Sequence, residues 1–472
     1  MSESEQLFVE YKGKSYPVVF SEKKKPWLWE TENWMNLYIP PENTKKNAFN
    51  IENKLRRLEH LAGHRYIKKE MAKFYADEIE ANWRIEGEHL DSYQLRSQLI
   101  NKLGLNVPEW SPKREVVRNE KENAALEGSL FLLNHKGDFT IETLCETHKI
   151  IGKGESDSNK KHFFGKFRTS GELVGKLDLE SKKYIAYYQA PPQESVPKLM
   201  DEYLQWWKES HNKYPLPIGA ALAHLYFVII HPFHDGNGRM ARLLTDRYFV
   251  TSDEASFRPV NIGATIRTHR KDTQDTLLDI SVITGASEAT LKGSKFADDM
   301  DDLPNTSREP LLPYICTSLE IVENKNSYYN DISQATRGFL NDFVRLLLSF
   351  QENAINGAIA RVDKIKKMIN FFDKAGNKLS KNEKLILRNA FFSDELVSSK
   401  INCIADIQDE YEADDIWEKL HQIGLLNERN KPVFDLSLLE SRGKSFFASE
   451  PLNTDIQNDD NYTQEQSFFS LK

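Results

Sequence analysis

Apolar residues recur at helical spacing over much of the chain. Leu55, Leu58 and Leu61 repeat at steps of three among charged residues that favour helices, which predicts a helix over about 51–82. Asp91 can cap a further helix over 91–103. The same texture predicts helices at 113–134, 140–152, 196–209, 218–230 and about 312–372, and shorter ones over 380–440. The pattern therefore indicates a mainly α protein.

One stretch follows a strand pattern instead. Residues 165–176 and 182–188 are richer in β-branched and aromatic side chains, and a polar turn at 178–181 separates them. This predicts a β-hairpin that Pro191 and Pro192 bring to an end.

The N-terminal 45 residues are expected to be irregular. Within them, Trp27, Trp29 and Trp34 lie close together in sequence, and we expect them to anchor this segment on the body of the protein. A platform for a ligand is the alternative.

Composition narrows the class of protein. The 472 residues suggest about three domains, and 39% hydrophobic with 28% charged residues is typical of a folded chain. The net charge of −8 argues against a protein whose main task is to neutralise phosphate backbones. Three widely spaced cysteines predict neither a disulfide framework nor a cysteine-based zinc site.

The first residues, MSESEQLFVEYKGKSY, contain no apolar stretch, so we expect no signal peptide, and we expect no membrane segment either. The longest apolar run, Ala220–Ile230, is too short to span a bilayer and is interrupted by His224. We therefore expect a cytoplasmic protein.

The segment HPFHDGNGRMAR, residues 231–242, has the residues needed to handle phosphate. A Gly-Asn-Gly turn before a helix can bind an anion through its backbone N–H groups, and Arg239 and Arg242 would project from one face of that helix. Asp235 can hold Mg²⁺ on phosphate oxygens, and His231 can accept a proton from a hydroxyl. The combination suits the transfer of a phosphate-containing group from a nucleotide to a hydroxyl.

Each part of this segment also has an ordinary interpretation. A single histidine at a helix end is usually structural, and a single GxG is a common turn. His224, His231 and His234 could form a metal cluster, but Pro232 ends the helix directly after His231, so a regular helical spacing is not expected.

At this segment the chain resembles the Fic family, whose signature HPFx(D/E)GNGRxxR it matches at every specified position. The similarity extends over roughly 27–338. The upstream segment IEGEHLDSYQLRSQLINKLGL resembles the N-terminal region of a bacterial subgroup that carries the inhibitory motif (S/T)xxxE(G/N). The resemblance implies a mainly α fold, with a Fic-type helical core, a β-hairpin flap and a small C-terminal winged-helix-like domain.

The implied domain organisation has five parts. They are an N-terminal region with an inhibitory helix (1–110), a catalytic core (111–290), a linker with further core helices (291–375), the winged-helix-like domain (376–445) and a disordered tail (446–472).

The resemblance also implies roles for single residues. His231 would be the general base, Asp235 would bind Mg²⁺ on the α- and β-phosphates, and Phe233 would anchor the loop. The nucleotide would be bound by the anion cradle, by the two arginines and, at its adenine, by a tyrosine pair: Gly236, Asn237, Gly238, Arg239, Arg242, Tyr328 and Tyr329. Core packing is an equally ordinary role for the two tyrosines. The flap, around 174–187, would align a target segment by strand addition.

Glu86 is the regulatory candidate. In the family this glutamate pairs with the second arginine of the signature, here Arg242, and so takes the position of the γ-phosphate. The family's Ser or Thr four residues earlier is Asn82 here, which leaves the strength of inhibition open. The ordinary alternative is a solvated residue at a helix end.

The resemblance implies a protein adenylyltransferase that moves AMP from ATP to a Ser, Thr or Tyr hydroxyl. Transfer of UMP or phosphocholine, removal of AMP from a modified target, or a non-enzymatic DNA-binding or adaptor role are the alternatives. The candidate recognition helix around 414–420 is acidic, so DNA is not an expected partner. Expected partners are ATP and a protein target, which includes the chain itself. Several members of the family regulate themselves through assembly, so a homo-oligomer is also open.

Overall fold

A computed structural model of the chain describes residues 7–11, 14–21, 26–61, 65–102, 119–135, 138–255, 315–392 and 410–439. The described residues fall into two compact units that divide between Asp373 and Lys374. The predicted linker at 291–310 and the predicted tail at 446–472 lie outside the described residues.

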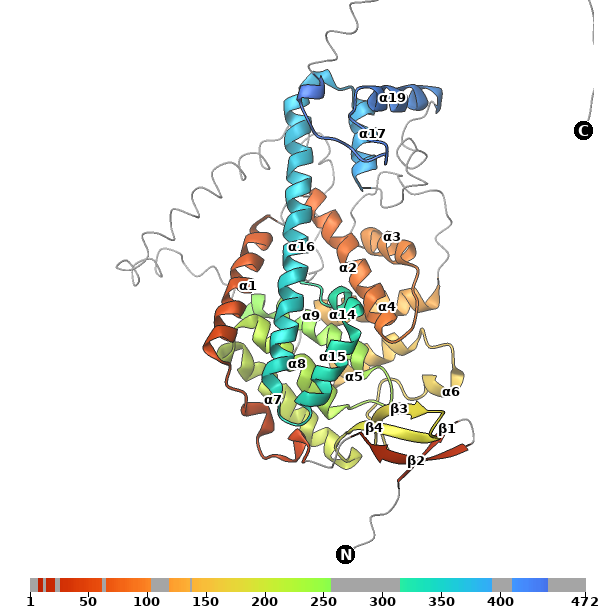
Figure 1. Ribbon diagram of the computed structural model, residues 1–472, viewed down its shortest axis with the longest axis vertical. Helices are drawn as coiled ribbons and strands as arrows, with labels where there is room; N and C mark the ends of the chain where they lie inside the picture. The colour runs from red at the N-terminus through yellow and green to blue at the C-terminus, as the bar shows by residue number, and fades with distance from the viewer. Residues whose placement is uncertain are drawn as a thin grey trace, which may run out of the picture. The chain divides into compact units, whose positions relative to one another are not determined.

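Helices make up most of the first unit (Figure 1). They are α1 (Glu42–Leu61), α2 (Arg65–Ile85), α3 (Ser92–Lys102), α4 (Glu120–Asn134), α5 (Ile141–Gly152), α6 (Ser158–Lys161), α7 (Val196–Lys213), α8 (Leu216–Ile230), α9 (Asn237–Ala255), α14 (Ser318–Glu323), α15 (Lys325–Ala335) and all but the last two residues of α16 (Leu340–Ala375). The mainly α fold predicted from the sequence is confirmed.

The centre of this unit is α8. Its sequence is apolar on every side, so the helix is buried along almost its whole length and packs against α9, α7 and α1. Because α8 is held on several sides, the loop that follows it starts from a fixed point.

Two helix predictions need correction. The helix expected at 51–82 is two helices, α1 and α2, and α1 already begins at Glu42. The sequence between them contains Gly63, a poor helix former. The helix expected at 113–134 is described from Glu120, where the Asn119 side chain accepts a hydrogen bond from the backbone N–H of Lys121. Asp91 does cap α3, by accepting from the N–H of Gln94 at 3.1 Å.

The described strands form one sheet in the order β1-β2-β4-β3, from β1 (Phe8–Tyr11), β2 (Lys14–Phe20), β3 (Leu173–Asp178) and β4 (Lys183–Gln189). β3 and β4 form the predicted hairpin, with a register shift between Val174 and Gly175. β2 lies parallel to β4, with Val18 opposite Tyr184 (Figure 1).

Two strand expectations were wrong. The N-terminal 45 residues are not irregular throughout, because they contribute β1 and β2; only Val18 of β2 is buried, so no clear apolar alternation marks the strand. The first hairpin strand begins at Leu173 rather than at 165, because the preceding residues bind the loop after α8, where the N–H of Arg168 donates to the Pro232 oxygen at 2.9 Å.

The tryptophan anchor predicted for the N-terminal segment is confirmed. Trp27 and Trp34 are buried, with their rings edge-on to Tyr188 and Tyr226 at centroid distances of 5.2 and 5.1 Å. The Trp29 indole donates to the Gln189 carbonyl at 3.1 Å.

The second unit contains α17 (Lys381–Phe392) and α19 (Glu410–Gln422), which pack together. Ile416 and Leu420 of α19 are buried, and the chain then turns back, with the N–H of Asn427 donating to the Lys431 oxygen at 3.0 Å. The winged-helix assignment stays a prediction. Within the described residues, no helix combines the length and the apolar character that a bilayer crossing requires.

Candidate active site

His231 lies at the point where α8 ends. It adopts a left-handed backbone conformation with φ of 51°, and its N–H donates to the Phe227 oxygen at 3.0 Å. Pro232 follows and prevents the helix from continuing. The imidazole Nδ1 lies 3.3 Å from the Val228 carbonyl oxygen. Since a carbonyl only accepts, Nδ1 carries the proton, and the lone pair is on Nε2.

The half-buried ring of His231 is neutral at pH 7. Burial lowers the pKa of His231 to about 4, and the nearby Arg168 also favours the neutral ring, against the opposing effect of the Val228 carbonyl. A neutral imidazole with a free Nε2 lone pair can accept a proton from a hydroxyl.

The loop from 232 to 236 is braced from inside. Phe233 is fully buried, and the Asn237 side chain closes the turn by accepting from the Phe233 N–H at 3.0 Å and donating to the Phe233 oxygen at 2.7 Å. Gly236 has a φ of 77°, a left-handed conformation that favours glycine. The loop therefore leads directly into the N-terminus of α9, whose first N–H groups lack helical partners.

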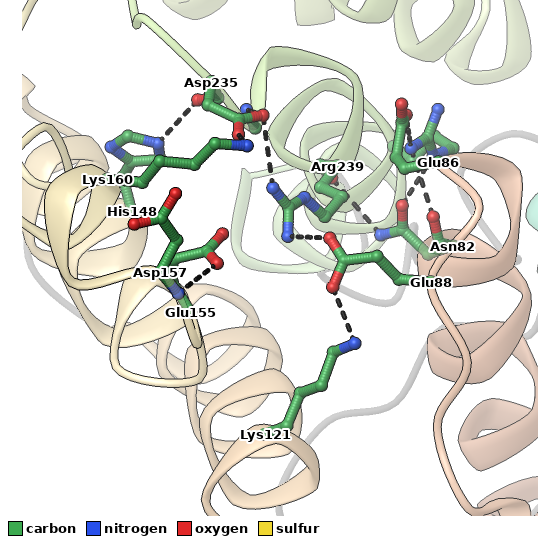
Figure 2. Close-up of polar contacts among 12 residues, drawn as sticks. Asn82, Glu86, Glu88, Lys121, His148, Glu155, Asp157, Lys160, Asp235 and Arg239 are labelled. Carbon is green, nitrogen blue, oxygen red and sulfur yellow. Dashed lines mark hydrogen bonds and ion pairs between the residues drawn. The ribbon is translucent and has the colours of Figure 1, made fainter. Parts of the chain in front are cut away.

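His148 of α5 supports this loop, and sequence reasoning missed it. Its ring stacks on Phe233 at 3.7 Å, and its Nδ1 accepts from the N–H of Gly165 at 3.0 Å. Nε2 therefore carries the proton and donates to the backbone oxygen of Asp235 at 2.9 Å (Figure 2). A single histidine within an amphipathic helix gave no signal of this role.

Asp235 has a part-exposed carboxylate. One oxygen accepts from the Gly236 N–H at 2.6 Å and lies 3.4 Å from Arg239, whereas the other lies 3.8 Å from Lys160. Mg²⁺ in nucleotide sites is usually held by one or two carboxylates together with substrate phosphates. A part-exposed carboxylate beside a helix N-terminus fits that requirement. Among the described residues, no group of three or more His, Cys, Asp or Glu side chains could hold a metal on its own.

Arg239 and Arg242 both lie at the start of α9, and each is paired with a carboxylate from the segment after α2. Arg239, 5% exposed, lies 3.0 Å from the Glu88 carboxylate, and its guanidinium lies over the Trp83 ring. The other Glu88 oxygen lies 2.7 Å from Lys121 (Figure 2).

Arg242 is almost completely buried and forms an ion pair with Glu86. Its Nε donates to the Asn82 side-chain oxygen at 2.5 Å, and its Nη2 donates to the Asn82 backbone oxygen at 3.2 Å. Although burial disfavours the charged form, the Glu86 carboxylate keeps the pKa of Arg242 above its usual value. The pairing of Glu86 with Arg242 is thus present in the structure.

The end of α2 is built to bring Glu86 to this place. Gly87, with a φ of 81°, turns the chain after the helix, and Lys325 donates to the backbone oxygens of Arg84 and Ile85 at 2.9 and 3.1 Å. Gly238 leaves room for the carboxylate, since a Cβ at this position would lie 2.5 Å from the Glu86 Oε1.

Tyr328 and Tyr329 of α15 have different surroundings. The Tyr328 hydroxyl is buried 2.7 Å from Nε2 of His224, whereas Tyr329 is 46% exposed. Thr245 donates to the Ala241 oxygen and so accepts from His224 Nδ1, which makes Tyr328 the donor to Nε2. Tyr328 therefore packs in the core, and Tyr329 is the one of the pair that presents surface.

The three histidines considered for a metal cluster have separate partners. Both ring nitrogens of His224 bind hydroxyls, as just described, and His234 Nε2 accepts from the Thr169 N–H at 3.1 Å.

The chain is similar to one family model and to several curated proteins. Residues 138–249 match the model of the Fic/DOC family. The protein adenylyltransferase fic-1 of Caenorhabditis briggsae is 28% identical over 222 residues, which cover 46% of this chain and 38% of that protein. The protein adenylyltransferase Fic of Drosophila melanogaster is 28% identical over 197 residues, which cover 42% of this chain and 36% of that protein. The chain thus matches less than two fifths of the length of these curated relatives.

Two solved structures are also similar. Fic-1 (residues 134–508) from C. elegans has a TM-score of 0.41 and 21% identity, and covers 68% of this chain and 73% of its own. A Fic family protein from Desulfovibrio desulfuricans has a TM-score of 0.41 and 19% identity, and covers 78% of this chain and 86% of its own. The match to the Fic/DOC family model, over 138–249, includes α8, the loop after it and most of α9. This part of the chain is therefore similar to a Fic/DOC-family domain.

Proposed function

We propose that this protein is an adenylyltransferase that moves AMP from ATP to a Ser, Thr or Tyr hydroxyl of a protein. One short loop joins a neutral His231, at the end of α8, to a helix N-terminus that carries two arginines, and this arrangement carries the proposal. The curated relatives that are similar to this chain bear the name protein adenylyltransferase, which supports the same assignment.

The chemistry follows from the placement of these groups. The target hydroxyl oxygen attacks the α-phosphorus of ATP while His231 Nε2 takes its proton, and the bond from the α-phosphorus to the bridging oxygen breaks. Pyrophosphate leaves with the electron pair of that bond. The N-terminus of α9, with Gly236, Asn237 and Gly238, stabilises the negative charge on the α-phosphate oxygens, while Arg239 and Arg242 bind the outer phosphates.

Asp235 would hold Mg²⁺ against the α- and β-phosphates. When bound, the ion supplies positive charge that neutralises the phosphate oxygens. Asp235 itself stays oriented by the Gly236 N–H and by His148 on its backbone oxygen.

The pairing of Glu86 with Arg242 would hold the enzyme in an inhibited state. A carboxylate on Arg242 takes the guanidinium that should bind the γ-phosphate, so ATP binds in a pose unsuited to in-line attack. Asn82 strengthens this arrangement, because it binds Arg242 through both its side chain and its backbone oxygen.

The partners we propose are ATP and a target protein with an accessible hydroxyl, and Tyr329 is the stronger of the two tyrosines as an adenine contact. The three widely spaced cysteines of the sequence suit a reducing compartment such as the cytoplasm, which is the location we propose. Transfer of another nucleotide or of phosphocholine is the nearest alternative.

A panel of donors tests the assignment. The Glu86→Gly variant is incubated with ATP, UTP, GTP or CTP, each labelled at the α-phosphate, or with labelled CDP-choline. Labelling of protein from ATP above the other donors supports adenylylation, whereas a preference for another donor rejects it.

A further inference from the structure

Arg168 contacts both the base of the flap, the β3–β4 hairpin, and the end of α8 with the loop after it. It precedes β3 by a few residues and is 2% exposed. Its guanidinium donates to three backbone oxygens, those of His231 at 2.7 Å, Ser170 at 2.9 Å and Pro191 at 2.5 Å. The backbone N–H of Arg168 donates to the Pro232 backbone oxygen at 2.9 Å. One side chain thus ties its own segment of backbone to two others, at Pro191 and His231, that are distant in sequence.

The bond to His231 falls on a residue with an unusual backbone. A φ of 51° is disfavoured for a residue with a Cβ, and such a conformation persists when its surroundings fix it. His231 is held by hydrogen bonds on both sides of its Cα. Its backbone oxygen accepts from the Arg168 Nε, and its imidazole donates to the Val228 backbone oxygen. Together they set the direction of the ring.

The other two bonds fall at the base of the flap. Ser170 precedes β3, and Pro191 follows β4. β4 is also tied to the end of α8, because the Tyr188 hydroxyl donates to the Ile229 oxygen at 2.5 Å. The flap and His231 are therefore both hydrogen-bonded to the Arg168 guanidinium, so a movement of either would strain these bonds.

We propose that Arg168 is a positioning residue for the transfer reaction, which fixes the backbone of His231 relative to the flap so that imidazole and target hydroxyl meet. This inference rests on the proposed function. Arg168 makes no hydrogen bond to Gly236–Gly238, Arg239 or Arg242 in the described structure, so it acts on proton transfer rather than on nucleotide binding.

The test compares Arg168→Lys and Arg168→Met in the Glu86→Gly background. The rate of AMP transfer should fall about a hundredfold in Arg168→Met and less in Arg168→Lys, which keeps one donor. The dissociation constant for ATP should stay within about twofold of the value for Glu86→Gly alone. A general loss of structure would instead weaken ATP binding together with the transfer rate. A rate that is unchanged, or that falls only in proportion to nucleotide binding, overturns the proposal.

Arg247→Lys is the matched control. Arg247 is also buried and also donates to three backbone oxygens, those of Leu132, Leu133 and His135, far along the chain from the flap. Its replacement should lower the melting temperature about as much as Arg168→Lys does but leave the transfer rate unchanged. An equal loss of rate in both variants would contradict a specific role for Arg168.

A second readout does not depend on activity. The ¹³Cα and ¹³Cβ shifts of His231, assigned in ¹³C-histidine-labelled protein by comparison with His231→Ala, report its backbone conformation. They should move away from left-handed values in Arg168→Met, and in part in Arg168→Lys, but not in Arg247→Lys. Unchanged shifts reject the proposal. If Glu86→Gly transfers no AMP at all, the proposed function fails, and the shifts still decide whether Arg168 positions His231.

Discussion

Glu88 and Arg239 form an ion pair in which the carboxylate lies 3.0 Å from a guanidinium that is almost buried. Arg242 is likewise paired with Glu86, so both arginines that we expect to bind the outer phosphates have a carboxylate partner. Glu88 is also within 2.7 Å of Lys121, so it has a second cation to stay with when Arg239 turns to a phosphate (Figure 2).

Glu88→Gln should therefore strengthen nucleotide binding. A part-exposed ion pair contributes on the order of 1 kcal/mol or less, so the affinity for ATP should rise about two- to fivefold. Calorimetric titration of ATP into Glu88→Gln in a His231→Ala background measures this without turnover. Glu120→Gln, which removes an exposed carboxylate paired with Lys161 instead, is the control and should leave the affinity unchanged. An equal rise in ATP affinity in both variants would mean that the change in net charge, and not the release of Arg239, causes it.

Asn82→Ala should destabilise the protein. The side-chain oxygen of Asn82 accepts from the buried Nε of Arg242, and a hydrogen bond to a charged group contributes about 1.5–3 kcal/mol. The melting temperature should fall by a few degrees or more, as differential scanning calorimetry would measure. Asn82→Asp, which keeps the acceptor, should lose less; a larger loss in Asn82→Asp than in Asn82→Ala would show that the acceptor is not what matters.

Gly238 and Glu86 should be energetically coupled. A Cβ at 238 would lie 2.5 Å from the Glu86 carboxylate, so Gly238→Ala should lower stability in the wild-type background and less in Glu86→Gly. The four melting temperatures of a double-mutant cycle measure the coupling. Strictly additive effects would mean that Glu86 does not occupy the space beside Gly238.

His224 should make stability depend on pH. Burial, with a smaller effect of Arg242, lowers the pKa of His224 to about 3, whereas a histidine in the unfolded chain takes up a proton near pH 6.5. Below pH 6.5 the unfolded state binds a proton that the folded state does not, so this contribution to stability is complete above pH 6.5 and is lost as the pH falls toward 3.

Melting temperatures of wild type and His224→Gln between pH 7 and pH 5 check this prediction. Other groups titrate in both proteins, so the difference between the two curves is the quantity of interest. The advantage of wild type over the variant should shrink as the pH falls. Parallel curves would mean that His224 takes up a proton to the same extent in the folded and the unfolded protein over this pH range.

The parts of the site that were predictable lie close together in sequence. Residues 231–242 contain the proposed base, the turn and both arginines, so a single segment indicates the proposed chemistry. The pairing of Glu86 with Arg242 followed from the resemblance. His148 and Arg168 could not be found in this way, because each acts on backbone atoms of segments distant in sequence. β2 was missed for a similar reason, since one of its two partner strands, β4, is distant in sequence.

Labelling with ATP that carries ³²P at either the α- or the γ-phosphate tests the central claim most directly. We predict that Glu86→Gly protein becomes labelled from the α-phosphate and not from the γ-phosphate, that wild type is labelled far less, and that Glu86→Gly with His231→Ala is not labelled at all. Label from the γ-phosphate, or α-label that persists without His231, would contradict AMP transfer by this site.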